Sequence, residues 1–362
     1  MKMNEQRTDA DVQIIRKAEE LEKIRPLWHR LAVGHGSPLL DFDWFYAAAG
    51  SCCPPGKLFV AVYRGLDGEV AIAPLFEPNG HGELEILGTD LLSEPSGFLY
   101  SRPSALVKLL PVLQQHGKSL FLKRIPVHST EHRIFCDWNL KQFLVTGEFE
   151  NRAPYLPLAG SWEEFIARLS SRRRSDLRRA RRRAEAMGRV KVRVWRPKLS
   201  DLSYHLERFY AVEAANWKGR NGTAILQRPR LRRFFDHYAE LAASRGILRF
   251  GKLTIDGKMA SGLLGVVYAN RFFLLKIGYD EAFRKASPGI LLIHEAIRYA
   301  FSEGLDSFEF LGYDEPWLSL WKPQYRAYLF LRAWPLGPSG AWRFVLNIIR
   351  KTRIRLRKEL FR

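Results

Sequence analysis

The residues best suited to chemistry lie between Phe272 and Trp321, where an apolar run precedes a polar loop and then an apolar-faced segment. The loop ends in Ser287, Pro288, Gly289 and Ile290, just after Arg284 and Lys285. Proline is favoured in the first turn of a helix, so this order predicts strand, loop and helix, with the helix opening at Ser287-Pro288-Gly289. A helix start offers unpaired N–H groups and the positive end of the dipole. The loop is therefore a candidate site for an anionic cofactor.

Three titratable residues near this loop could exchange protons. Tyr279 and Asp280 end the strand that faces the loop, and Glu213 lies on a helix predicted over residues 202–215. Either carboxylate could act as a base if burial raised its pKa, and Tyr279 could protonate a leaving group. Most carboxylates in such positions cap helices or pair with arginine, and a strand tyrosine is more often a core residue. The residues alone leave both interpretations open.

Motifs of several common enzyme classes are missing. The sequence contains no HExxH, GxSxG, Walker or CxxC pattern, which argues against hydrolase, NTPase and zinc-enzyme classes. Cys52 and Cys53 are adjacent and Cys136 stands alone, so the cysteines have neither disulfide nor metal-ligand spacing. We therefore expect no metal site.

Length and composition indicate a folded protein of two domains. The chain has 362 residues, of which 46% are hydrophobic and 13% aromatic, which excludes a disordered protein. No run reaches the roughly 20 apolar residues of a membrane-spanning helix. The polar start MKMNEQRTDADVQ lacks the apolar core of a secretory signal. We expect a cytoplasmic protein.

The net charge of +20 predicts attraction to an anionic partner. Composition does not distinguish nucleic acid, acidic lipid and phosphorylated small molecules.

The two halves of the chain repeat one plan. Strand-like runs at 58–63 and 70–76 flank Asp67-Gly68, and runs at 248–255 and 259–268 flank Asp256-Gly257, so each half contains a hairpin. The second turn follows the first by 189 residues. Predicted helix openings at Pro103 and Pro288, and closing glycines at Gly117 and Gly304, recur at nearly the same offset. This indicates two α/β (α+β) domains, each a mixed, mostly antiparallel sheet flanked by helices.

Two basic segments stand outside the repeat. Residues 161–188 predict one long amphipathic helix that carries eight arginines between Arg172 and Arg183. It is either a solvated face or an arm that binds a polyanion, for which arginine geometry is suited. The tail 341–362 predicts a basic amphipathic helix, which either docks on the second domain or lies on anionic lipid. The domain prediction is thus 1–153, a linking helix 154–190, a catalytic domain 191–340 and the tail 341–362.

Several motifs resemble the CelD-like acyltransferases of the GNAT superfamily, in the tandem-domain branch that includes the FemAB-type aminoacyltransferases. The resemblance spans roughly Val12 to Trp334. Its motifs are Trp217-Lys218-Gly219-Arg220-Asn221-Gly222-Thr223, Gly278-Tyr279-Asp280, Ser287-Pro288-Gly289, Phe308-Glu309-Phe310 and Asp314-Glu315-Pro316.

The resemblance implies two GNAT-like folds and acyl transfer from acyl-coenzyme A to an amine or hydroxyl. Members of the family are associated with cellulose or exopolysaccharide synthesis. The donor would bind at Arg284, Lys285, Ser287, Pro288, Gly289 and Ile290. The acceptor would contact Trp217, Lys218, Arg220, Asp314 and Glu315, and the catalytic candidates are Glu213, Asp280 and Tyr279.

Three hypotheses follow. The first is an acyl-coenzyme A dependent transferase acting on an envelope or exopolysaccharide precursor. The second is a FemAB-type transferase that uses aminoacyl-tRNA, with the arginine helix as its RNA footprint. The third is a catalytically degenerate scaffold at the membrane surface. It is favoured by the single Gly289 where relatives have two or three glycines, and by Trp317-Leu318 where a Tyr-Lys pair is common.

Overall fold

The computed structural model describes residues 11–79, 82–92, 94–139, 141 and 143–360. The polar start at residues 1–10, from which we expected no secretory signal, lies outside this range, as do the last two residues of the tail. Among the described helices, none combines the length and apolar character needed to cross a bilayer.

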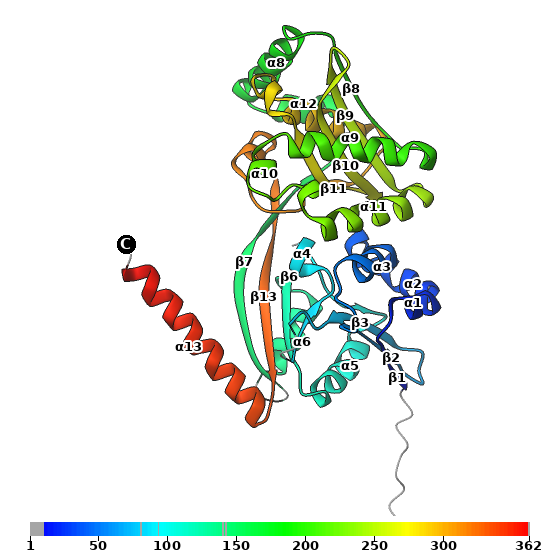
Figure 1. The fold of residues 1–362 in the computed structure, drawn as a ribbon, viewed down its shortest axis with the longest axis vertical. Helices are drawn as coiled ribbons and strands as arrows, with labels where there is room; N and C mark the ends of the chain where they lie inside the picture. Colours follow the sequence, from blue (N-terminus) through cyan, green and yellow to red (C-terminus); the bar gives the residue numbers. More distant parts are fainter. Residues whose placement is uncertain (1–10, 80–81, 93, 140, 142, 361–362) are drawn as a thin grey trace, which may run out of the picture.

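The N-terminal half contains a hairpin-based sheet with helices on its faces (Figure 1). Its strands are β1 (Asp11–Ile15), β2 (Leu58–Arg64), β3 (Val70–Phe76), β4 (Glu83–Ile86), β5 (Leu99–Tyr100), β6 (Ser119–Pro126) and β7 (Phe143–Pro157). Its helices are α1 (Ala18–Leu21), α2 (Arg25–His35), α3 (Phe42–Ser51), α4 (Thr89–Leu92), α5 (Pro103–Gln115) and α6 (Thr130–Asp137), with short 3-10 turns η1 (Glu22–Ile24) and η2 (Pro38–Leu40).

The C-terminal half repeats the arrangement. Its strands are β8 (Val190–Trp195), β9 (Leu248–Ile255), β10 (Lys258–Tyr268), β11 (Arg271–Tyr279), β12 (Ser307–Glu309) and β13 (Gln324–Pro335). Its helices are α7 (Trp162–Arg168), α8 (Ser171–Glu185), α9 (Leu202–Ala214), α10 (Trp217–Arg220), α11 (Pro229–Ser244), α12 (Pro288–Ser302) and α13 (Pro338–Leu360). The 3-10 turns are η3 (Leu199–Asp201), η4 (Ile225–Gln227), η5 (Glu281–Ala286) and η6 (Pro316–Trp321).

The predicted repeat is confirmed by backbone geometry. Pro103 and Pro288 each stand in the first turn of a helix, α5 and α12. The turn glycines Gly68 and Gly257 both have φ of 78°, which only glycine adopts without strain. Each half also contains one parallel strand pair, β4 with β6 and β11 with β12, on either side of its helix.

The described strands form one continuous sheet in the order β1-β2-β3-β4-β6-β13-β7-β12-β11-β10-β9-β8, with β5 beside β3. The long strands β7 and β13 join the halves (Figure 1). β7 pairs antiparallel with β13 from Phe143 to Tyr155, and its end, Tyr155–Pro157, pairs with β12. β13 lies between β6 and β7, so the last strand of the chain completes the N-terminal sheet. The predicted catalytic range 191–340 therefore includes a strand that packs in the other half.

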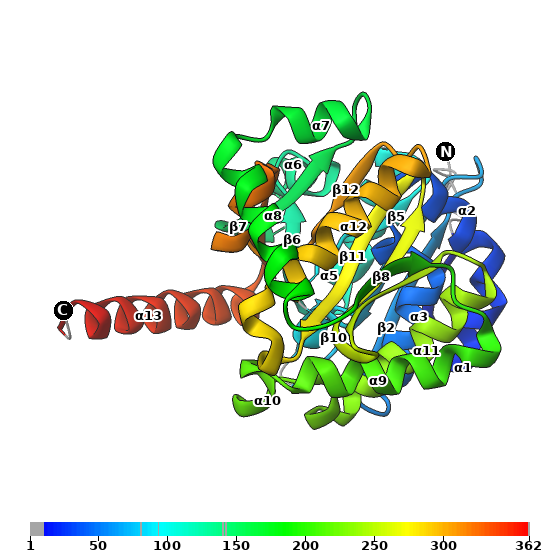
Figure 2. The ribbon, with the colours of Figure 1, turned by 90° about the horizontal axis from the view of Figure 1, so that it is seen from above.

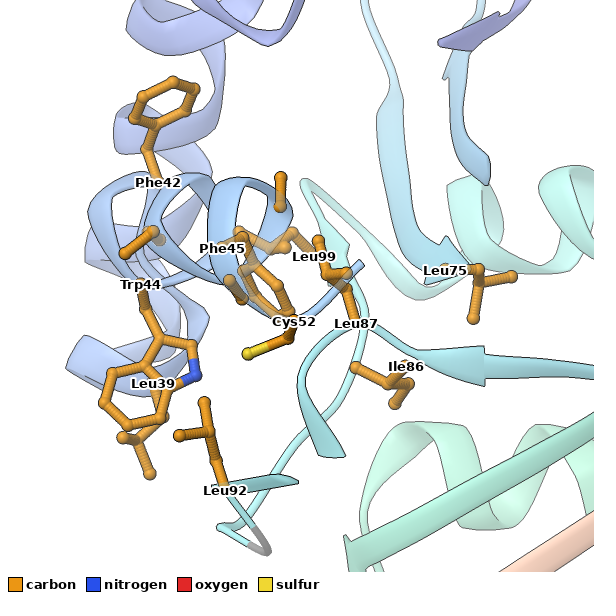
Figure 3. Packing of buried hydrophobic residues seen from close by; sticks show 14 of the residues in the cluster. Leu39, Phe42, Trp44, Phe45, Cys52, Leu75, Ile86, Leu87, Leu92 and Leu99 are labelled. Atoms are coloured by element: carbon orange, nitrogen blue, oxygen red, sulfur yellow. The ribbon is translucent and has the colours of Figure 1, made fainter. Parts of the chain in front are cut away.

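The halves are held together by aromatic contacts and by partly buried ion pairs. Trp44 on α3 packs edge-on against Phe234 and Tyr238 of α11, with ring centroids 4.8 and 5.0 Å apart. Beside them, Asp41 and Asp43 are bonded by Arg245 at 2.5 and 2.7 Å. Figure 3 shows Trp44 and Phe45 of α3 among the buried leucines of the N-terminal half. The contact sets the position of one half relative to the other.

The prediction of one helix over 161–188 is wrong. Ser161 starts α7 with a capping box to Glu164, and α7 ends at Arg168 because Leu169 is extended. Ser170 then caps the separate helix α8 by accepting from the N–H of Arg173. Capping side chains that bond the backbone here outweigh the apolar stripe that suggested continuity.

The tail is helical, as predicted, and α13 extends away from the two halves (Figures 1 and 2). Its first turns pack on β13, with Phe344 5.2 Å from Trp334, and Arg343 bonds the carbonyl of Gly82. The helix therefore docks by its beginning on the N-terminal sheet, not on the second domain. Trp342, Val345, Leu346, Ile348 and Ile349 are exposed along it.

Candidate active site

The loop singled out from sequence forms the start of α12. Asp280 caps the short turn η5 by accepting from the N–H of Ala282 at 2.9 Å. Ser287 then adopts a left-handed conformation with φ of 52°, which turns the chain into α12. Among the described residues, no side chain caps this helix start. The N–H groups of Gly289 and Ile290 therefore remain available to a ligand.

The strands β11 and β12 diverge next to this helix start. They pair only over Arg271–Phe273 and Ser307–Glu309, although β11 continues to Tyr279. The pairing of β11 with β10 shifts by one residue at Leu275, and such a bulge bends a strand. On the other side, Leu311 and Gly312 have φ of 57° and 54°, so the chain turns away after β12. The divergence opens a gap at the end of β11.

The gap at the end of β11 holds a cavity of about 390 Å³. A separate cavity of about 440 Å³ lies between the two halves. The gap cavity is lined by residues of β11, α10, η5, α12 and the start of η6. Nine of the residues named from sequence line it: Trp217, Lys218, Tyr279, Arg284, Ser287, Pro288, Gly289, Ile290 and Glu315. It is completed by five that sequence reasoning did not assign to the site: Asn216, Ile277, Gly278, Ile293 and Trp317. We refer to it as the donor cavity.

Asn216 holds the α10 loop against β11. Its side chain accepts from the N–H of Lys218 at 2.8 Å and donates to the carbonyl of Tyr279 at 3.2 Å. Lys218 Nζ in turn donates to the carbonyl of Ile277 at 3.1 Å. These bonds place the indole of Trp217, which is 48% exposed, at the rim of the donor cavity.

Glu213 lies behind the cavity wall rather than in it. It is buried, with Oε1 3.1 Å from Lys218 Nζ and Oε2 accepting from the N–H of Ile225 at 2.9 Å. A Cβ on Gly278 would stand 2.7 Å from Glu213 Cα, so glycine is required for β11 to pass this close to α9. Both oxygens of Glu213 are thus engaged in holding α9, the α10 loop and η4 together.

The remaining predicted site residues stand outside the lining of the donor cavity. Asp280 caps η5, and Arg220 forms an ion pair with Glu281. Lys285 offers its carbonyl to Arg183. Asp314 is hydrogen-bonded to Tyr325, whose pKa is raised first by burial and then by that bond.

A pair of opposite charges close to β11 was not predicted from the sequence. Burial lowers the pKa of Lys276 and raises that of Glu94, while the attraction between the two opposes both changes. Glu94 accepts from the N–H of Gly312 at 3.3 Å, and Arg124 donates to the carbonyl of the same glycine at 2.7 Å. The signal was present, since Lys276 is the one charge within the run FFLLKIGY.

A pair of histidines at a metal-ligand spacing was also not predicted. His128 and His132 stand four residues apart, a spacing that zinc ligands use, with Glu131 between them. Their rings lie 6.2 Å apart, and His132 Nδ1 accepts from the N–H of His128. Within the described part of the chain, no group of three or more His, Cys, Asp or Glu side chains could hold a metal.

The equivalent helix start in the N-terminal half, at α5, has the carboxylate of Glu69 beside it. Ser104, which follows Pro103 as Gly289 follows Pro288, donates to Glu69. Lys108 binds the same carboxylate at 2.8 Å. An internal carboxylate thus lies beside the first turn of α5, bound by two of its side chains, whereas the first turn of α12 opens onto the donor cavity.

Comparison with known proteins shows the same fold. Residues 171–319 match the family model described as "Acetyltransferase (GNAT) domain". The crystal structure of FemX aligns with a TM-score of 0.59 at 13% identity, over 90% of this chain and 97% of that one. No curated protein sequence matches the chain.

Two further structures are similar over their whole length. The C-terminal domain of a putative lysylphosphatidylglycerol synthetase from Agrobacterium fabrum has a TM-score of 0.57 at 11% identity, over 91% of this chain and 95% of that one. A tandem GNAT protein from the clavulanic acid biosynthesis pathway has a TM-score of 0.50 at 12% identity, over 91% and 99%. The fold is that of tandem GNAT proteins, and the match of residues 171–319 to the acetyltransferase family model supports a transferase.

Proposed function

We propose that this protein transfers an acyl group from acyl-coenzyme A to an amine or hydroxyl of an envelope or exopolysaccharide precursor. The observation that carries the proposal is the uncapped start of α12, which opens onto the donor cavity where β11 and β12 diverge. The CelD-like resemblance of the surrounding motifs supports the choice of acceptor.

The cavity suits a coenzyme A donor in both of its chemical parts. The N–H groups of Gly289 and Ile290 and the guanidinium of Arg284 provide donors and positive charge for phosphate oxygens. Ile277, Ile293 and Trp317 provide apolar walls for an aliphatic arm. A Cβ on Gly289 would meet no atom closer than Tyr279 Cδ1 at 3.8 Å, so glycine there is dispensable for packing and leaves room for a ligand. The bound donor supplies an activated thioester.

We assign the chain's own groups as follows. Tyr279 lines the donor cavity and is proposed to protonate the departing thiolate, and the proton released by the attacking amine or hydroxyl then restores the Tyr279 hydroxyl. Glu213 and Asp280, candidates for the base from sequence, are proposed to position the cavity walls, because their oxygens already bind Lys218, Ile225 and Ala282. Trp217 at the rim is proposed to stack on the acceptor.

Calorimetry with acetyl-coenzyme A and longer acyl-coenzyme A tests the donor. We expect binding at micromolar to millimolar concentration. Absence of binding at millimolar donor would refute the proposal and favour a scaffold without activity.

Aminoacyl-tRNA is the second candidate donor. It is favoured by a cavity rich in arginine beside the donor cavity, and by the similarity in fold to FemX. Incubation with tRNA charged with a labelled amino acid separates the two, since label transferred to an acceptor fraction would select this donor.

We also propose that α13 contacts anionic lipid. Its exposed apolar residues Trp342, Val345, Leu346 and Ile349 and its basic sequence suit an interfacial helix. Deletion of residues 341–362 should abolish sedimentation with anionic vesicles at low salt. Unchanged sedimentation would contradict the proposal.

A further inference from the structure

A third cavity, larger than the other two, lies between α8 and η6. Its volume is about 840 Å³, and we refer to it as the arginine groove. Its cations are Arg172, Arg173, Arg179, Arg183 and Lys322, and its acidic residue is Asp176. Asp176 forms an ion pair with Arg179. The groove therefore has a clear excess of positive charge.

The arginines in the first turn of α8 destabilise the helix that carries them. α8 has no acidic residue in its first turn, where Arg172, Arg173 and Arg174 stand instead. Cations at a helix N-terminus meet the positive end of the dipole and repel one another. The arrangement becomes favourable when an anion lies among them, because each guanidinium then gains a charge-assisted hydrogen bond.

The arginines of α8 differ in what they already bind. Arg174 donates to the carbonyl of Ala167 at 2.8 Å, and Arg181 forms an ion pair with Glu185 at 2.6 Å. Arg183 donates to the carbonyl of Lys285 at 2.6 Å, so it ties α8 to the turn before α12. In contrast, Nη1 of Arg173 is buried without a hydrogen-bond partner among the described residues. A buried guanidinium N–H that lacks an acceptor costs free energy, which a ligand oxygen would recover.

The arginine groove continues from the donor cavity. Both cavities are lined by Ser287, Ile290 and Trp317, so they meet at the start of α12. Figure 2 shows α8 beside α12, consistent with the packing of their buried residues in one core. A ligand whose acyl end lies at β11 and whose diphosphate lies at the start of α12 would extend into the groove.

We propose that the arginine groove binds the phosphorylated nucleoside end of the donor, through Arg172 and Arg173. This rests on the proposed function, and it adds a phosphate site on α8 to the one at α12. The ligand class is an adenosine carrying both a diphosphate and a separate monoester phosphate. The groove then distinguishes coenzyme A from its form without the 3′-phosphate, because the extra dianion supplies the partner that Arg173 lacks.

The test compares two double variants that remove the same charge from the same helix. Arg172→Ala with Arg173→Ala removes groove cations, whereas Arg178→Ala with Arg182→Ala removes exposed arginines that do not line the groove. Binding of acetyl-coenzyme A, 3′-dephospho-coenzyme A and adenosine 3′,5′-bisphosphate is measured by calorimetry on the full chain. Thermal unfolding checks that both variants fold, and the groove variant should melt no lower than the wild type since it loses repulsion.

We expect the groove variant to bind acetyl-coenzyme A and adenosine 3′,5′-bisphosphate about ten- to hundredfold more weakly, and the control within about twofold of wild type. The preference for coenzyme A over its dephospho form should disappear in the groove variant and persist in the control variant. An equal loss of affinity in both variants, or no loss of affinity in either, would overturn the assignment of the groove. Neither result would contradict donor binding in the donor cavity. A wild type that binds no acyl-coenzyme A would remove the proposed function as well. The groove assignment would also be overturned if the groove variant lost binding of an RNA acceptor stem but bound acetyl-coenzyme A as the wild type does.

Discussion

Gly289→Ala separates a role in donor binding from a role in folding. Gly289 is the second residue of α12, and the methyl group of an alanine at this position would lie 3.8 Å from Tyr279 Cδ1. That distance is ordinary van der Waals contact. Alanine is favoured over glycine in a helix by roughly 0.5–1 kcal/mol, so the variant should unfold about 1–2 °C higher than the wild type.

The same methyl group would meet a ligand bound at the start of α12. If phosphate oxygens accept from the N–H groups of Gly289 and Ile290, the methyl displaces them, and loss of a hydrogen bond to a charged group weakens binding about tenfold or more. The assay is the Kd for acetyl-coenzyme A by calorimetry, beside a thermal melt. Gly34→Ala is the matched control, since Gly34 lies exposed on α2 and its added Cβ has nothing within 4 Å.

A Gly289→Ala variant that is as stable as expected and binds the donor within about twofold of wild type would refute the reasoning. Such a result would mean that the donor does not approach the backbone at α12. An equal loss of affinity in Gly34→Ala would point to an indirect effect of helix stability.

Three further changes test the packing in and around the site. Gly278→Ala should lower stability by about 1–3 kcal/mol in a denaturant melt, because its Cβ would stand 2.7 Å from Glu213 Cα, and unchanged stability would contradict the close packing of β11 on α9. Ser287→Gly should raise stability by about 1 kcal/mol by relieving the left-handed φ of 52°, with Lys322→Gly, at φ of 53°, as a second such position for comparison. Burial lowers the pKa of His294 to about 4 from its usual 6.5. As the pH drops, His294 is protonated in the unfolded chain before it is protonated in the folded one. The free energy of unfolding should therefore fall by about 2–3 kcal/mol between about pH 6.5 and pH 4. His294→Phe should reduce that slope, and an equal slope would exclude His294 as its source.

Local signals in the sequence predicted the elements that depend on local physics. Proline at a helix start and glycine at a turn act through their own backbone, so Pro288 and Gly257 marked α12 and the β9-β10 hairpin correctly. The same reasoning found most of the donor cavity, since Tyr279 and Ser287–Ile290 are close in sequence as well as in space. It failed at residues 161–188, where the stripe of apolar residues suggested one helix and the caps at Ser161 and Ser170 made two.

The sequence by itself determined that the chain has two related α/β units and that a helix opening at Pro288 follows β11. It did not determine which carboxylates are free to react. Glu213 is 12 residues from Ile225 and 65 from Gly278, and only the packing of α9 beneath β11 reveals that both of its oxygens are already bonded. The placement of β13 between β6 and β7, the meeting of Glu94 with Gly312, and the junction of α8 with α12 likewise depend on contacts between distant segments. Such contacts are selected by the total burial and hydrogen bonding of the fold, which no short stretch of sequence encodes.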